Sequence, residues 1–381
     1  MKVAFVFDTV LIRNNEHYYG VTLTYDFFQK RYLDKYDEML LITRKDDSND
    51  THNISGLGQT DGPRLSVLPS ENYRTIPDVF IKHKKIYKEI EAKIKDVDKV
   101  IIRMPSVLGV IASRICRKIK KPYMIECVAN AYDSFRFHSN SAGALVAIPM
   151  HLACKRAIKT SPCVLYVTNE YLQKVYPTNG KSYACSDVFI DEKMPCKNNK
   201  QILRYNSKTI KICTVGNVGL RYKGHDRVLK AISLLKKRGL SIKYYIIGPG
   251  DNSALSKEAK ALGVEDSVVF VGSVEHNKVY KEVMKADIYV QPSLTEGLPR
   301  AVIEAMSVGM IVVGSDAGGI PELLDKRFIY PKNNYKKLAS LLESISVEDI
   351  IIQSKRNKAK SLKYTEKTAN AKRNSIYLNS I

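Results

Sequence analysis

The sequence has few features of membrane-spanning, secreted or metal-binding proteins. No apolar run approaches the roughly 20 residues that a transmembrane helix needs, and the longest candidate, residues 142–150, contains Pro149. The first apolar run, residues 3–7, is shorter than the roughly 7–15 residues of a signal-peptide core, so we expect no signal peptide. The 7 cysteines include no Cys-x-x-Cys or Cys/His ligand spacing, which predicts reduced cytosolic thiols and no structural zinc.

The charge is strongly unbalanced and the chain is long. A length of 381 residues predicts two domains rather than one core. The net charge of +22 predicts attraction to an anionic partner, which is a nucleic acid, an acidic membrane surface or a phosphorylated substrate. A Lys-rich composition on solvated helix faces explains the same charge equally well.

Short apolar segments alternate with helical patterns in both halves of the chain. This alternation predicts an α/β fold with two doubly wound, Rossmann-like domains. We expect an N-terminal domain over residues 1–184, a linker over 185–207, a C-terminal domain over 208–346 and a helical tail over 347–381 that packs back on the N-terminal domain. Within the first domain we expect a polar loop to residue 20, a helix from there to about residue 36, and an exposed insertion over residues 45–64.

The loops that follow the predicted strands of the second half are the candidate ligand-binding surface. In an open parallel sheet, ligands bind outside the carboxyl ends of the strands. Five loops follow these strands, and four of them are rich in glycine, which lets backbone amides approach a ligand. We therefore expect all five at one edge of one sheet.

Charged residues lie in these loops. Arg221 and Lys223 stand just before a predicted helix, an arrangement suited to a diphosphate, although a solvated basic loop has the same composition. Glu304, in the second turn of the helix predicted from Pro299, suits a ribose diol, and Glu296 suits sugar hydroxyls. Each glutamate alone is better explained as a partner of the helix dipole.

The segment from Glu296 to Glu304 (EGLPRAVIE), with RYKGHD before it and GSDAGGIPELL after it, resembles the E-x7-E region of retaining GT-B glycosyltransferases of the GT4-like group, the glycosyl transferases group 1. The resemblance covers residues 207–325 well and the first half only by pattern. It implies a GT-B fold with two Rossmann-like domains facing across a cleft. It also implies a nucleotide-diphospho-sugar donor on the C-terminal domain, retention at the anomeric carbon, and no metal ion or other cofactor.

Transferred position by position, the resemblance implies a donor site. The donor-binding residues would be Gly20, Arg221, Lys223, Val274, Glu296, Gly297, Leu298 and Glu304. The cations would bind the diphosphate, Glu304 the ribose and Val274 the base, while Glu296 with the next two amides would hold the sugar. Many relatives place the arginine where Val218 stands here, so Arg221 departs from their pattern.

The first half would bind the acceptor. Gly20 would let its loop approach the donor diphosphate. Many relatives carry a histidine after the strand that corresponds to residues 123–128, where this chain has Glu126 and Asn130, with His138 further on. We expect Glu126, with Glu296 and Lys223, to be catalytic. Arg103 either points into the cleft or is a salt-bridge partner, and no DxD motif has a setting that suggests a metal site, since the Asp46-Asp47 pair lies in the polar insertion.

The predicted reaction is transfer of a hexosyl or N-acetylhexosaminyl group to a glycan or polyprenyl-diphosphate-linked acceptor in bacterial capsule, O-antigen or exopolysaccharide synthesis. We expect a cytoplasmic protein, peripheral on the anionic inner face of the membrane, with the basic helices over residues 82–95 and 114–121 as its contact. We expect no nucleic-acid partner. The alternatives are a glycoside hydrolase using Glu296 and Glu304 as acid and nucleophile, a sugar-nucleotide epimerase, and a basic nucleic-acid-binding module.

Overall fold

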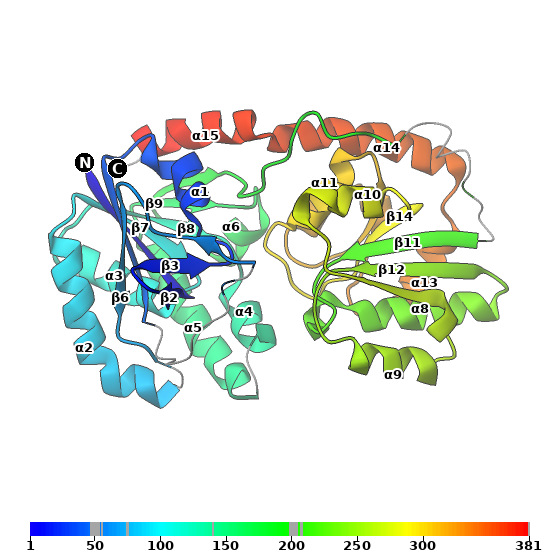
Figure 1. The fold of residues 1–381 in the computed structure, drawn as a ribbon, viewed down its shortest axis with the longest axis horizontal. Coiled ribbons are helices and arrows are strands. Elements are labelled where there is room, and N and C mark those ends of the chain that lie inside the picture. Colours follow the sequence, from blue (N-terminus) through cyan, green and yellow to red (C-terminus); the bar gives the residue numbers. More distant parts are fainter. Residues whose placement is uncertain are drawn as a thin grey trace. The chain divides into compact units, whose positions relative to one another are not determined.

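The chain forms two α/β units, each built on one parallel sheet (Figure 1). The computed structural model describes residues 1–45, 54, 56–73, 76–138, 141–197, 205 and 209–379, so the Asp46-Asp47 pair lies outside the described residues. Unit 1 comprises Met1–Cys185 and Asn370–Ile381, and unit 2 comprises Ser186–Ala369.

Unit 1 contains a seven-stranded sheet in the order β10-β9-β8-β7-β1-β4-β6, and every pairing in it is parallel. Such strands are buried on both faces, which is why they read as continuous apolar runs. Its strands are β1 (Lys2–Val10), β4 (Glu38–Arg44), β6 (Leu65–Ser70), β7 (Lys99–Met104), β8 (Tyr123–Cys127), β9 (Cys163–Tyr166) and β10 (Lys181–Ala184).

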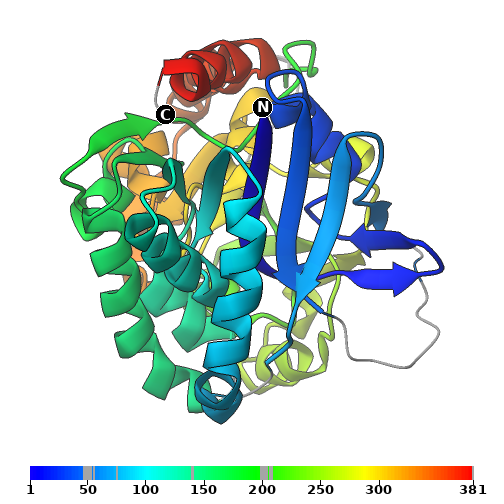
Figure 2. The ribbon, with the colours of Figure 1, turned by 90° about the vertical axis from the view of Figure 1, so that its left-hand side faces the viewer.

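Helices cover both faces of this sheet. On one face lie α2 (Ile76–Lys95), α3 (Val107–Lys118) and α5 (Ser141–Lys159), with α3 in contact with both neighbours (Figure 2). The opposite face is covered by α1 (Tyr25–Phe28), the π-helix η1 (Gln29–Leu33) and the end of α15 (Glu366–Asn379), whose Ile376 and Tyr377 belong to the same core as Phe5 and Phe28. Two shorter helices, α4 (Ala131–His138) and α6 (Tyr171–Val175), complete the unit.

Three short strands replace part of the polar segments that we expected in unit 1. A small antiparallel sheet joins β2 (Ile12–Asn14), β3 (His17–Gly20) and β5 (Gly58–Gln59). Asn15 has a φ of 55°, the left-handed conformation that a two-residue hairpin turn requires, so the Asn-rich stretch was the missed signal. The expected helix from residue 20 to 36 was also wrong, because it is divided into the short α1 and a π-helical turn.

Unit 2 contains a six-stranded parallel sheet in the order β13-β12-β11-β14-β15-β16. Alternate side chains of β11 show its two-sided burial, since Ile212 belongs to one core cluster and Cys213 to the other. Its strands are β11 (Thr209–Val215), β12 (Ser241–Ile247), β13 (Val268–Gly272), β14 (Ile288–Gln291), β15 (Ile311–Ser315) and β16 (Ile329–Tyr330).

Two helical layers enclose this second sheet. One core cluster takes apolar residues from α8 (His225–Lys237), α9 (Ser253–Ala261) and α13 (Tyr335–Glu343). The other takes them from α10 (Val279–Val283), α11 (Arg300–Ser307) and α12 (Ile320–Leu323). The helix predicted from Pro299 is α11, and Pro299 is its N-cap residue.

The predicted tail is divided between the units. Its first helix, α14 (Val347–Ser361), packs against α11 in unit 2. Asn357 donates from Nδ2 to the carbonyl of Met310 at 2.9 Å, and Lys358 donates from Nζ to the carbonyl of Ser307 at 2.7 Å. Only residues 370–381 belong to unit 1, so the structure differs from the expectation of one tail on the N-terminal domain. Among the described helices, none combines the length and apolar character that crossing a membrane requires.

Candidate functional site

The candidate site of unit 2 lies where the direction of strand addition reverses. The chain goes from β11 outward to β12 and β13, then returns to add β14 on the other side of β11. Ligands of such sheets bind at this switch point, outside the carboxyl ends of the strands. Because all pairings are parallel, the five loops predicted to share one edge do so, and the loops after β11 and β14 are neighbours.

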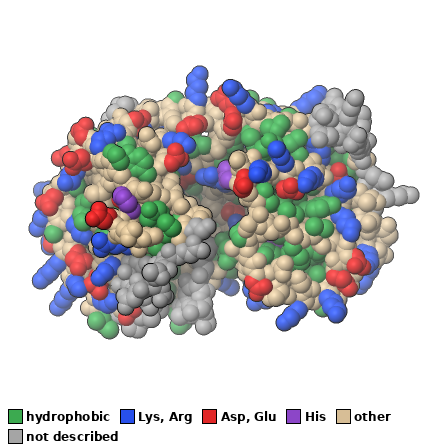
Figure 3. Space-filling model, viewed as in Figure 1, with side chains coloured by type: hydrophobic (Ala, Val, Ile, Leu, Met, Phe, Trp, Pro, Cys, Tyr) green, Lys and Arg blue, Asp and Glu red, His purple; other side chains and the backbone are tan. Residues whose placement is uncertain are grey.

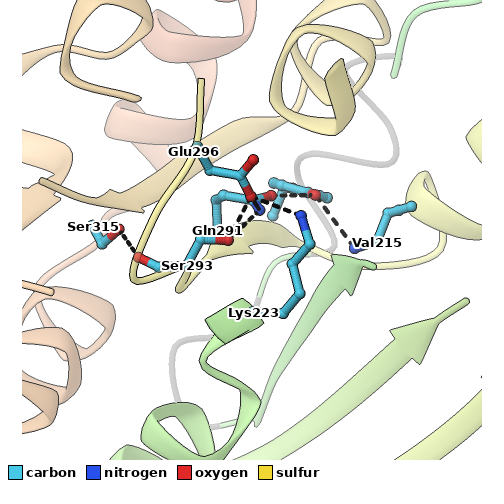
Figure 4. A network of polar contacts seen from close by, with 7 residues as sticks. Val215, Lys223, Gln291, Ser293, Glu296 and Ser315 are labelled. Atoms are coloured by element: carbon cyan, nitrogen blue, oxygen red, sulfur yellow. Dashed lines mark hydrogen bonds and ion pairs between the residues drawn. The ribbon is translucent and has the colours of Figure 1, made fainter. Parts of the chain in front are cut away.

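Lys223 and Glu296 come from these two neighbouring loops. The Nζ of Lys223 lies 2.8 Å from Oε1 of Glu296, although 73 residues separate them (Figure 4). Their side chains are 19% and 13% exposed, so the pair is shielded without being sealed from solvent. The predicted proximity of these two residues is therefore present in the structure.

A hydrogen-bond network fixes one oxygen of Glu296. Besides Lys223, Oε1 accepts from Ser293 Oγ at 2.7 Å and from Gln291 Nε2 at 3.1 Å. Tyr289 donates its hydroxyl to Oε1 of Gln291 at 2.8 Å and holds that amide from behind. No described residue hydrogen-bonds to Oε2, so this oxygen keeps its full capacity to accept (Figure 4). Sequence reasoning missed the roles of Gln291 and Ser293.

Two glycines let the loops approach one another. Gly224 has a φ of 76°, and a Cβ there would lie 2.0 Å from the carbonyl oxygen of Pro292. Gly318, with a φ of 56°, would place a Cβ 1.9 Å from the carbonyl oxygen of Glu296. No other residue fits at either position. This explains why the two loops packed against the segment from Pro292 to Glu296 each carry a glycine at the point of contact. Gly319 then donates its amide to the carbonyl of Gly297 at 2.8 Å.

The electrostatics of the pair favour a charged lysine. Burial alone lowers the pKa of Lys223, but the charge of Glu296 and the hydrogen bond to it outweigh burial and raise that pKa above its usual value. The lysine therefore keeps its positive charge in a partly desolvated setting. There it attracts an anion more strongly than it would in water.

Glu304 has a partner of its own, separate from the network of Glu296. Its Oε1 lies 3.1 Å from Nε2 of His276, a side chain that is 74% exposed. The hydrogen bond to Glu304 raises the pKa of His276. Sequence reasoning missed His276, which lies two residues after Val274 in the loop that follows β13. The separate partners of Glu296 and Glu304 do not favour an acid and nucleophile pair.

The remaining predicted residues of unit 2 lie in loops at the same edge of the sheet. Arg221 is exposed and makes no ion pair with a described residue. Val274 and Leu298 are half-buried and pack on the core cluster beneath the edge. Gly297 is half-buried beside them.

A buried histidine supports the loop that carries Lys223. His225 is 3% exposed, and its Nδ1 lies 2.8 Å from the hydroxyl of Tyr244. Burial lowers the pKa of His225 to about 4, so the imidazole is neutral at pH 7. It is the first residue of α8 and lies two positions from Lys223, yet the sequence did not mark it as different from any other histidine.

In unit 1 the structure places Glu126 in a closed network. Its Oε2 lies 2.9 Å from NH1 of Arg103, and its Oε1 accepts from Tyr32 at 2.8 Å and from Tyr377. Glu126 is 3% exposed, and both its oxygens are bound. Arg103 is thus a salt-bridge partner, the second of the two predicted possibilities. The catalytic role predicted for Glu126 stays a prediction that this buried position does not favour.

The other predicted residues of unit 1 lie apart from this network. Asn130 accepts from the amide of Tyr132 at 3.0 Å and thereby caps the start of α4. His138 is the last residue of that helix. Gly20 ends β3 and is buried, and a Cβ there would lie 2.8 Å from Leu11 Cδ2, a side-chain end that would have to shift to make room for it. No group of three or more His, Cys, Asp or Glu able to hold a metal occurs within the described ranges.

Comparison with known proteins gives a family model and several similar relatives. The model described as "Glycosyl transferases group 1" matches residues 196–365. Protein CapJ of Staphylococcus aureus is 33% identical over 364 residues, which are 94% of this chain and 90% of CapJ. The amylovoran biosynthesis glycosyltransferase AmsK of Erwinia amylovora is 38% identical over 134 residues, 32% of this chain and 33% of AmsK.

Many solved structures are similar over nearly the whole chain, and two of them illustrate the likeness. Sucrose-phosphate synthase of Thermosynechococcus elongatus has a TM-score of 0.70 at 14% identity and covers 99% of this chain and 98% of its own. HepE of Anabaena, in complex with UDP, has a TM-score of 0.67 at 16% identity and covers 100% of both chains. At such low identity, these likenesses describe the fold alone.

Proposed function

The chain belongs to the glycosyl transferases group 1 family, has the GT-B fold and is a glycosyltransferase, and from this premise we propose how it works. It transfers a hexosyl or N-acetylhexosaminyl group from a nucleotide-diphospho-sugar to a glycan or lipid-linked acceptor, with retention at the anomeric carbon. Family membership removes the support for the hydrolase, epimerase and nucleic-acid-binding alternatives.

The Lys223–Glu296 pair at the switch point carries this proposal. It offers a charged ammonium and, beside it, a carboxylate whose Oε2 has no described partner. A nucleotide-diphospho-sugar presents the complementary groups in the same order, because its phosphates adjoin its sugar hydroxyls. In the free protein the two side chains neutralise each other. When the ligand binds, its phosphates contact Lys223 and its sugar hydroxyls contact Glu296.

Each group has a defined task in the proposed reaction. Lys223 stabilises the negative charge that develops on the departing diphosphate, helped by Arg221 and the amides of Gly297 and Leu298. Glu296 accepts hydrogen bonds from donor-sugar hydroxyls and thereby orients the anomeric carbon. Glu304 accepts from the ribose once the diol replaces His276. These cationic and amide groups supply the charge stabilisation without a metal ion or other cofactor.

The donor base and the acceptor follow from weaker observations. HepE, whose fold is shared, was solved with UDP, so we propose a uridine nucleotide that lies beside Val274. AmsK acts in amylovoran biosynthesis, so we propose a role in bacterial surface polysaccharide synthesis. A polyprenyl-diphosphate-linked acceptor and the high positive charge together favour a cytoplasmic enzyme bound peripherally to the inner membrane face.

A thermal-shift panel of UDP-, GDP- and ADP-sugars tests the donor site. A ligand that binds only the folded state raises the melting temperature by mass action. We expect a UDP-sugar to raise it for the wild type and for Lys237→Ala, an exposed lysine of α8 that serves as the control. Lys223→Ala should abolish the shift.

The panel also separates the ways in which the proposal can fail. If no nucleotide-sugar shifts the wild type, a nucleotide-sugar donor is excluded. An undiminished shift in Lys223→Ala would leave the donor proposal standing but remove the diphosphate site from Lys223.

A further inference from the structure

Helix α5 of unit 1 exposes large apolar side chains. Leu145, Ile148 and Leu152 are 78%, 60% and 59% exposed. Steps of three and four residues place them on one side of the helix, with the exposed Pro149 between them. The outward side of a surface helix is ordinarily polar, so a row of three aliphatic side chains there requires an explanation.

The same side of α5 becomes cationic towards its C-terminus. Lys155, Arg156 and Lys159 follow Leu152 by three, four and seven residues, and all three are exposed. The opposite side, with Ala147, Cys154, Ala157 and Ile158, is buried. Residues 141–159 contain no Asp or Glu, so nothing on this helix neutralises the cations.

The neighbouring helix extends the positive charge. Helix α3 packs against α5, and its last turns expose Arg114, Arg117 and Lys118. Elsewhere the charge is mixed: on the face seen in Figure 3, Lys and Arg side chains are interspersed with Asp and Glu over both units. The net charge of the whole chain therefore does not locate a binding surface, whereas the acid-free α5 does.

We propose that the outward side of α5 binds an anionic lipid surface. The three aliphatic side chains enter the boundary between headgroups and acyl chains, and the cations beside them bind lipid phosphates. This inference deepens the membrane attachment proposed above. It makes α5 the main contact, keeps the end of α3, which belongs to the expected segment 114–121, as an extension, and leaves out the expected segment 82–95.

The chemistry of this side favours a lipid surface over other partners. A nucleic acid would use the cations but leave the leucines and isoleucine in water. A second copy of the same surface would bring the three cations of each α5 together without any carboxylate of α5 to pair with them. An anionic bilayer accommodates both the aliphatic side chains and the cations of α5.

Vesicle co-sedimentation tests the apolar half. The wild-type protein should bind vesicles of phosphatidylcholine mixed with phosphatidylglycerol and bind pure phosphatidylcholine poorly. Leu145→Gln/Ile148→Gln/Leu152→Gln should weaken binding by about tenfold or more. Ile81→Gln, which alters a side chain 79% exposed on α2, is the control and should bind as the wild type does.

A second variant tests the cationic half. Lys155→Gln/Lys159→Gln should weaken binding by about fivefold per charge at low salt and by less at high salt. Lys236→Gln/Lys237→Gln, which removes two exposed charges of α8 in unit 2, should leave binding unchanged. An equal loss in both charge variants would overturn the assignment to α5.

The remaining outcomes are equally decisive. The inference is wrong if the wild-type protein does not bind anionic vesicles or if the triple glutamine variant binds them normally. It is also wrong if Ile81→Gln weakens vesicle binding as much as the triple variant does. Light scattering that shows a dimer dissociated by the triple variant would make α5 a contact between copies. No nucleotide-sugar is present in these assays, so their failure leaves the donor proposal untouched, and unchanged melting temperatures confirm that the variants fold.

Discussion

Both units hold a buried or half-buried ion pair near the carboxyl ends of their strands, and the Arg103–Glu126 and Lys223–Glu296 pairs have opposite character. The Arg103–Glu126 and Lys223–Glu296 separations are 2.9 and 2.8 Å. Glu126 has both oxygens bound, whereas Glu296 has one oxygen with no described partner. Position at the sheet edge is therefore not enough to make a binding site. The carboxylate must also be partly exposed and keep an oxygen that can still accept a hydrogen bond.

The two cations differ in the same way. The Arg103 guanidinium lies 5.9 Å from the ring centre of Phe7 and 5.8 Å from that of Phe27, so aromatic rings enclose it. The Lys223 stem passes over Gly216, where even a Cβ would lie 3.4 Å from its Cδ. The glycine lets the lysine stem lie close to the backbone, whereas aromatic rings flank the guanidinium of Arg103.

The largest expected effect comes from Arg103→Met, which leaves Glu126 buried without its cation. We expect the free energy of unfolding to fall by about 3–5 kcal/mol, measured by urea denaturation. Adding Glu126→Gln to the same variant should recover part of this loss, because the remaining group is neutral. Unchanged stability with lost turnover would instead support the catalytic role predicted for Glu126.

The matched substitution in unit 2, Lys223→Met, should affect activity more than stability. Loss of one charge-stabilising group should lower kcat/KM by about 10²–10³-fold in a transfer assay with the donor found by thermal shift. Gln291 and Ser293 still donate to Glu296 in this variant. The melting temperature of Lys223→Met should therefore fall less than that of Arg103→Met. A larger fall in Lys223→Met would reverse the comparison of the two pairs.

Acid should destabilise unit 2 through His225. The unfolded chain binds a proton near the ordinary histidine pKa of about 6.5, whereas folded His225 does so only near 4. The free energy of unfolding should therefore fall as the pH decreases from about 6.5 to about 4, by at most about 3 kcal/mol. Its contribution is constant above and below that window. In His225→Asn, melting temperatures across the window should depend less on pH; an unchanged profile would contradict this origin.

The smallest expected effect is that of Tyr377→Phe, which removes one hydroxyl donor from Glu126. Hydrogen bonds to charged groups contribute about 1.5–3 kcal/mol, and since Tyr32 still donates to the same oxygen we expect a loss near 1.5 kcal/mol. Tyr335→Phe, in unit 2, is the control because its hydroxyl has no described hydrogen bond. Equal melting temperatures for the two variants would show that Glu126 does not depend on the C-terminal helix.

The strands and the shared edge of the loops that follow them were predictable where local pattern is strong. The strands of unit 2 are continuous apolar runs because both their faces are buried, and their order along the chain fixes which loops share an edge. The hairpin at residues 12–20 was missed because its side chains are largely polar and its turn signal is the short Asn14-Asn15 stretch. The expected helix after it failed because tertiary packing of Phe28 and Tyr32 determines the backbone there.

The sequence by itself determined the α/β alternation, the five loops at one edge and the placement of Lys223 near Glu296, because parallel strands bring successive carboxyl ends together. Only the tertiary structure decided whether Glu126 or Glu296 keeps an oxygen without a described hydrogen-bond partner. Tyr377 reaches Glu126 across 251 positions of sequence, whereas no described group reaches Oε2 of Glu296. Burial and the saturation of hydrogen bonds depend on residues distant in the chain, so no local pattern distinguishes a closed carboxylate from an open one.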